Sequence, residues 1–331
     1  MFFVFFMLAF AMQSFAQNVE ALHDAIDKRD VPQIQALIDA GVDVNGKGAS
    51  KHTAFSLNLH KHADGPKTFE IAKLLLDSGA APNLDNDQEE TPLLWSTFYK
   101  NADIAKLLID AGADVNAKSY AGRTALMWAA MMGKNETVKL LLAAGADIEA
   151  RDEYVKNTSL IHAMWGYGDY AETLKILLDA GANINATSGC GKTALMETLD
   201  SGKNKSIKFL LASGADVNMK TDFGSTALMV ALGKYYEAGG QFETVKLLIA
   251  AGADVDSQDN NGDTSLIGVA RKGNIETVKL LLGAGADAAM KNNEGKTARD
   301  YALENNAAEI VALLDTITKA TQKEGSAVLE N

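Results

Sequence analysis

The chain of 331 residues contains one cysteine, Cys190, and only 4 prolines. A single thiol cannot form an intrachain disulfide, so side-chain packing has to stabilise the fold. Basic residues are outnumbered, because 31 Lys and Arg stand against 43 Asp and Glu, and the formal net charge is −12. Such a charge repels phosphate backbones and anionic lipid surfaces. We therefore expect no nucleic-acid partner.

Catalytic and cofactor motifs are also scarce. The sequence contains no nucleophile elbow and no zincin helix. The segment from Ala186 to Thr193 matches a loose Walker A pattern, but it lies in a turn between repeats and lacks the strand and long helix of a phosphate-binding loop. His60, His62 and Asp64 are spaced as metal ligands could be, yet no further ligand is clustered near them. We expect no enzymatic activity, no cofactor, no bound metal and no small-molecule substrate.

Only one long hydrophobic run is present, at residues 1–16. It ends in Ser14-Phe15-Ala16, which places small residues at the two positions that a signal peptidase reads, although no Lys or Arg precedes the run. Sixteen residues are too few for a stable membrane span. We expect residues 1–16 to be a cleaved signal peptide and the protein to be periplasmic or secreted. The alternative is an uncleaved N-terminal membrane anchor.

The remainder of the chain is repetitive. A Gly-Ala-Asp-Val-Asn landmark begins at Gly41, Gly79, Gly112, Gly145, Gly181, Gly214, Gly252 and Gly285, and four of the seven intervals are 33 residues. A second landmark, Thr-small-Leu, follows the glycine by 12 residues in every unit except the one at Thr158, where the distance is 13. Extra residues also fall inside the units that begin at Thr53, Thr158 and Thr226. A repeat of this length is typical of stacked helix pairs, since neither helix can bury its apolar face alone.

Each unit predicts a threonine that caps a short inner helix, an outer helix, and a glycine that ends the outer helix. These landmarks resemble the ankyrin repeat, whose signature is Thr-Pro-Leu-His followed by Gly-Ala-Asp-Val-Asn. The resemblance implies an all-α ankyrin-repeat solenoid with seven full repeats and N- and C-terminal capping units. We place this domain at residues 17–317 and a C-terminal tail at residues 318–331, and we expect a monomer.

The inner helices carry an unusual stripe. Counted from each opening threonine, positions +4, +7 and +8 share one side of the helix, and in ankyrin proteins that side lines the concave groove. In three successive repeats these positions hold Trp95, Phe98, Tyr99, Trp128, Met131, Met132, His162, Trp165 and Gly166. Tyr120 and Tyr154 occupy matching turn tips in the same stretch. Later repeats have polar or small residues there.

Aromatic side chains and methionine are enriched at protein interfaces. The stripe therefore predicts a scaffold that binds a partner protein through its concave face. Two alternatives stay open at this point. Position +4 could be half-buried packing between adjacent inner helices, and the protein could be a stabilising envelope factor or a secreted effector with no defined groove ligand.

Overall fold

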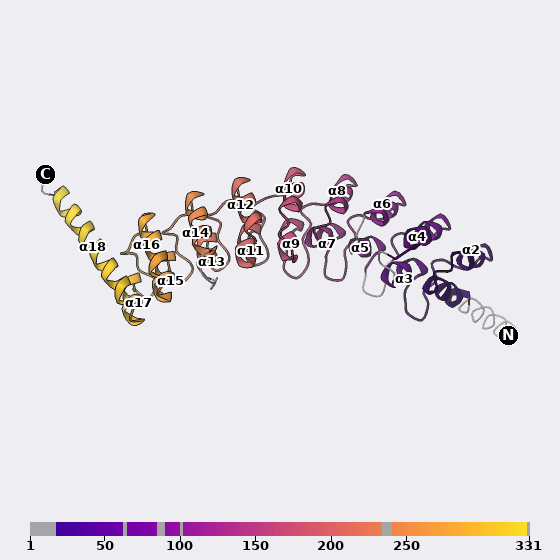
Figure 1. Ribbon diagram of the computed structural model, residues 1–331, viewed down its shortest axis with the longest axis horizontal. Helices are drawn as coiled ribbons and strands as arrows, with labels where there is room; N and C mark the ends of the chain where they lie inside the picture. The colour runs from indigo at the N-terminus through magenta and orange to yellow at the C-terminus, as the bar shows by residue number, and fades with distance from the viewer. Residues whose placement is uncertain (1–17, 62–64, 85–89, 100–101, 234–239, 330–331) are drawn as a thin grey trace, which may run out of the picture. The chain divides into compact units, whose positions relative to one another are not determined.

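The computed structural model describes residues 18–61, 65–84, 90–99, 102–233 and 240–329, with side chains up to residue 319 except at 240 and 241 (Figure 1). The chain divides into two compact units, one up to Asn183 and one from Ile184 onward. Residues 1–16, which we predict to be a signal peptide, lie outside the described residues. None of the described helices is long and apolar enough to cross a membrane.

The first unit is a stack of helix pairs that follows a helical segment at residues 18–27. Odd-numbered helices from α3 pack on one another in one row, and even-numbered helices from α4 form a second row (Figure 1). Its helices are α2 (Val31–Asp39), α3 (Ala54–Lys61), α4 (Thr68–Asp77), α5 (Pro92–Ser96), α6 (Asp103–Asp110), α7 (Ala125–Met131), α8 (Asn135–Ala143), α9 (Ser159–Trp165) and α10 (Ala171–Asp179).

The second unit repeats this arrangement, with α11, α13, α15 and α17 packed in order along one row. Its helices are α11 (Ala194–Ser201), α12 (Asn204–Ala212), α13 (Ala227–Gly233), α14 (Gly240–Ala250), α15 (Ser265–Lys272), α16 (Ile275–Gly283), α17 (Ala298–Glu304) and α18 (Ala308–Leu329). The described residues form no β-strand, only isolated bridges in the turns. The predicted all-α repeat fold, with seven helix pairs between two capping pairs, is confirmed. Helix α18 continues past residue 317, where we placed the end of the domain.

The two landmarks have separate structural roles. Most opening threonines cap their inner helix, because the hydroxyl accepts a hydrogen bond from the backbone N–H three residues later. This bond forms at Thr53, Thr124, Thr193, Thr226, Thr264 and Thr297. Thr91 and Thr158 make no such bond, and their hydroxyl groups are buried with no hydrogen-bond partner among the described residues.

The asparagine of the Gly-Ala-Asp-Val-Asn landmark joins one repeat to the next. Asn83 donates from Nδ2 to the Gly112 carbonyl at 3.2 Å and accepts from the Asp114 N–H at 2.7 Å. The same two bonds are made by Asn45, Asn116 and Asn218. Both groups of the amide are thereby used between neighbouring repeats, which explains why an asparagine recurs at this place.

Candidate binding surface

Four rings form a continuous strip across three successive repeats of the first unit. His60 of α3 meets Trp95 of α5 edge-on, with ring centroids 4.8 Å apart. Trp95 lies 5.7 Å from Phe98, and Phe98 lies 5.2 Å from Trp128 of α7. We call His60, Trp95, Phe98 and Trp128 the aromatic strip. Because each separation falls within the range of favourable ring contacts, the strip is one connected apolar surface.

The strip is partly covered by its own contacts. Phe98 is 40 % exposed and His60 is exposed, but Trp95 and Trp128 are half-buried. Neighbouring rings cover part of each indole, so these two tryptophans are less exposed than Phe98. Trp95 Nε1 is buried and has no hydrogen-bond partner among the described residues.

The structure corrects two predicted surface residues. Tyr99 is only 3 % exposed, and its hydroxyl donates to the Leu59 carbonyl at 2.7 Å. Helix α5 ends at Ser96, and the next backbone bonds, from Phe98 to Trp95 and from Tyr99 to Ser96, span three residues. This tighter turn rotates position +8 away from the direction that an α-helix would give it, so the tyrosine points inward.

His162 is the second correction, since it is 1 % exposed. Its Nε2 lies 2.8 Å from Oδ2 of Asp152, which is also buried. The other carboxylate oxygen accepts the N–H groups of Val155 and Asn157. The additional residue before Thr158 lets this turn fold back onto α9, which covers the imidazole. Burial lowers the pKa of His162, and the Asp152 carboxylate opposes that shift.

The other predicted residues lie outside the strip. Trp165 is 41 % exposed, and its ring centroid lies 5.5 Å from that of His162. Within the described residues this is its one aromatic contact. Tyr120 and Tyr154 form a separate exposed pair at the turn tips, with ring centroids 6.5 Å apart. A hydrogen bond to Tyr120 raises the pKa of Tyr154. The two remaining predicted residues, Met131 and Met132 at the end of α7, are half-buried.

Sequence reasoning missed His60 and Arg123. His60 is the +7 residue of its repeat, equivalent to Phe98, and counting from Thr53 would have found it. Arg123 precedes Thr124, and its guanidinium carbon lies 5.2 Å from the centroid of the Trp128 ring. Position −1, directly before the opening threonine, was not considered, although His52 at the same position stacks 5.1 Å from His60.

The same positions carry ion pairs in the second unit. The residues at −1 and +7 of one repeat are eight apart and pair as opposite charges. Arg271 contacts Asp263 at 2.8 Å, and Lys296 contacts Glu304 at 2.8 Å. Lys192 pairs with Asp200, so the lysine of the Walker-like segment is engaged by a carboxylate. At position +7 the aromatic residues therefore belong to the first unit.

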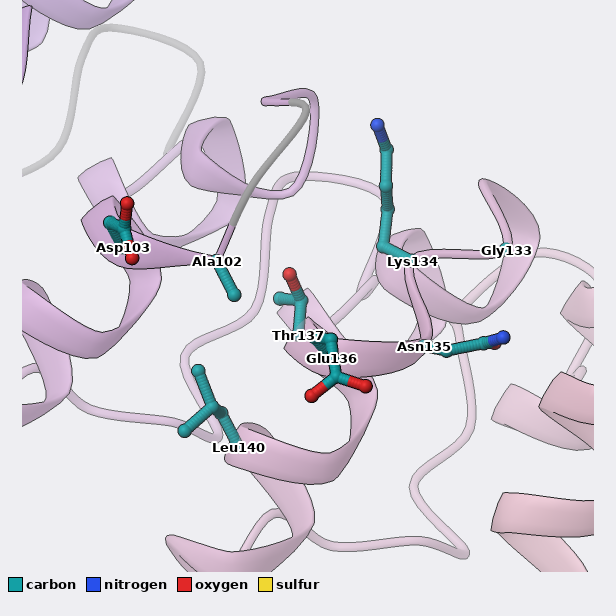
Figure 2. Close-up of a pocket in the computed structure, with 8 residues that line it drawn as sticks. All are labelled: Ala102, Asp103, Gly133, Lys134, Asn135, Glu136, Thr137 and Leu140. Carbon is teal, nitrogen blue, oxygen red and sulfur yellow. The ribbon is translucent and has the colours of Figure 1, made fainter.

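An open pocket of about 560 Å³ lies elsewhere in the first unit, at the N-terminal ends of α6 and α8 (Figure 2). Asp103, Lys134 and Glu136 line it with charges of both signs. Asn135, another lining residue, already accepts a hydrogen bond from Thr173 at 2.7 Å. Within the described ranges no three His, Cys, Asp or Glu side chains gather as metal ligands, and His62 and Asp64 fall outside those ranges.

Stacked helix pairs joined through their turns define a helical-repeat protein. Models of the ankyrin repeat match residues 59–152, 160–239 and 235–322. The chain belongs to the ankyrin-repeat family, whose repeats are general modules of protein–protein interaction. Among solved structures, it is similar to the ankyrin repeat domain of Bcl-3, described as a unique member of the IkappaB protein family, with a TM-score of 0.58 and 27% identity over 69% of this chain and 97% of that one. No functionally curated protein sequence matches the chain.

Proposed function

We propose that the protein is an interaction scaffold that binds a partner protein through the aromatic strip, on the concave face of its first unit, and performs no chemistry of its own. The observation that carries the proposal is the connected strip from His60 to Trp128, whose +7 residues His60 and Phe98 lie where three repeats of the second unit have ion pairs. Exposed connected apolar surface of this kind is typical of partner binding.

Variants of the strip test this proposal. The protein is used to capture partners from extracts of its source, and the affinity of each purified partner is then measured. Phe98→Ala and Trp128→Ala should each weaken binding by about 2 kcal/mol or more, because aromatic residues at the centre of an interface supply most of its free energy. Glu197→Ala, at the +4 position of the α11 repeat, is the matched control and should bind as the unchanged protein does.

The stability of the variants separates binding from packing. Trp128 is half-buried, so its replacement also removes some packing. If the ring serves packing alone, Trp128→Ala should lower the unfolding free energy by about 3 to 5 kcal/mol and leave affinity unchanged once the variant is folded. That result, obtained for both variants, would remove the proposed function.

We also propose that the protein is exported to the periplasm or secreted, on the basis of the apolar run and the Ser14-Phe15-Ala16 site. N-terminal sequencing of the protein recovered from its native compartment should give a chain that begins near Gln17. An intact residue 1 on protein from the membrane fraction would favour the uncleaved anchor instead.

A further inference from the structure

Arg123 supplies a positive charge at the end of the aromatic strip. Its guanidinium carbon lies 5.2 Å from the centroid of the Trp128 ring, and its Nε is buried with no hydrogen-bond partner among the described residues. The two terminal nitrogens are not covered in this way, and they make no hydrogen bond within the described residues. No carboxylate of the described residues forms an ion pair with this side chain. The edge of the guanidinium is therefore available to a ligand.

Arg123 has no ion-pair partner because of the residue at position +7 of its own repeat. Where −1 is charged in the second unit, as at Asp263 and Lys296, the +7 residue carries the opposite charge and forms an ion pair with it. In the Arg123 repeat the +7 position holds Met131, which cannot pair with a guanidinium. The charge that these repeats of the second unit pair internally has no ion-pair partner at Arg123, directly beside the strip.

Asp152 and Glu153, the two acids of the following turn, form no ion pair with Arg123. The carboxylate of Asp152 is buried, and it already takes three hydrogen bonds, from His162 and from two backbone N–H groups. Glu153 packs along Gly122, where its Cγ would lie 2.4 Å from an added Cβ. The two adjacent turns contain Lys118, Arg151 and Lys156 as further cations. This local excess of positive charge contrasts with the net charge of −12 of the whole chain.

We infer that the strip and Arg123 together bind a partner segment in which an Asp or Glu lies next to a large apolar side chain. This inference rests on the proposed function and names the kind of partner. The contact with Trp128 restrains the guanidinium, and its two terminal nitrogens can donate side by side to the two oxygens of one carboxylate. The apolar neighbour then rests on Phe98 and Trp128, where it excludes water from the ion pair.

A displayed library of peptides with random sequences provides the probe. Peptides are selected on the full chain, and the tightest binder is synthesised together with a version in which its acids are replaced by Asn or Gln. We expect the acidic peptide to bind about 10- to 100-fold more tightly than the amide version, as for a hydrogen-bonded charge pair. Arg123→Gln should abolish this difference. Arg123→Lys should keep part of it, because the charge stays and the planar fork is lost.

Lys118→Gln removes an exposed cation from the same turn and is the matched control, which should retain the full preference. Peptides that lose binding in Phe98→Ala but show no preference for acids would overturn this inference and leave the proposed function standing. An acid preference that survives Arg123→Gln would overturn it as well. If the selected peptides bind the Phe98→Ala variant as tightly as the unchanged protein, or if the library yields no binders, both this inference and the proposed function would be overturned.

Discussion

His162 provides a residue-scale test of the burial in α9. Because burial lowers the pKa of this imidazole, the folded protein holds it neutral while the unfolded chain takes up a proton near pH 6.5. The unfolded state then binds more protons, so the contribution of His162 to the free energy of unfolding should be fully present above that pH and fall as the pH drops below about 6.5. His23, whose pKa burial also lowers, contributes in the same direction.

Urea titrations at pH 7.5, 6.5 and 5.5 measure this dependence. His162→Gln should make the loss between pH 6.5 and 5.5 smaller, since the contribution of His162 is removed while that of His23 remains. The carboxyl groups with lowered pKa values, such as Asp254 and Asp300, act at lower pH and do not interfere. An unchanged slope in the variant would mean that His162 is accessible to solvent in solution.

Two residues of the predicted stripe show where residue-level prediction failed. Helical spacing placed Tyr99 and His162 on the same side as the tryptophans, and this assumption required a regular inner helix in every repeat. Helix α5 has only 5 residues before the backbone tightens into three-residue turns. The turn before α9 is one residue longer than the others, and Asp152 of this turn contacts the His162 imidazole. Unusual helix length and turn contacts depend on neighbouring repeats, so the pattern within one repeat could not reveal them.

At the scale of elements, two glycines make opposite predictions. Gly166 follows α9, and a Cβ there would lie 2.0 Å from the Met131 carbonyl oxygen. Gly268 lies within α15, where an added Cβ would meet nothing within 4 Å. Gly166→Ala should therefore destabilise the protein, because backbone atoms would have to move. Gly268→Ala should stabilise it by roughly 0.5 to 1 kcal/mol, because alanine loses less entropy in a helix.

Denaturant midpoints with unchanged slopes measure both changes. A neutral Gly166→Ala variant would show that the loop after α9 does not pack against α7 in solution. For the pair to be informative, both proteins must keep the helical circular dichroism of the unchanged chain.

Most elements were predictable because the repeat fixes their order and approximate length. The 33-residue period, the capping threonines and the closing glycines predicted the helix pairs, and the capping bond is present at Thr124 and Thr264. The function of the landmark asparagine was not predicted. Its two bonds to the next repeat, as at Asn83, join positions about 30 residues apart, and a single repeat read by itself contains no sign of them.

At the scale of the whole molecule, the repeats should unfold as neighbours that depend on one another. Leu141 of α8 has no exposed surface, and α8 packs against α6 on one side and α10 on the other. Leu141→Ala should cost about 2 to 5 kcal/mol, because it removes apolar contact and leaves a cavity between repeats. In an array that is held by nearest-neighbour interfaces, the damage should spread to the adjoining helices and weaken with distance.

Amide hydrogen exchange, resolved by segment, measures this spread. Leu141→Ala should lower protection most in α8, next in α6 and α10, and least in α15 and α17 of the second unit. Glu136→Ala is the control on the same helix, because its carboxylate forms an exposed 2.7 Å pair with Lys139, and it should change stability by no more than about 0.5 kcal/mol. Equal loss of protection in every helix of both units would contradict the nearest-neighbour description and show one cooperative body. Loss confined to α8 would show that the leucine packs within its own repeat alone.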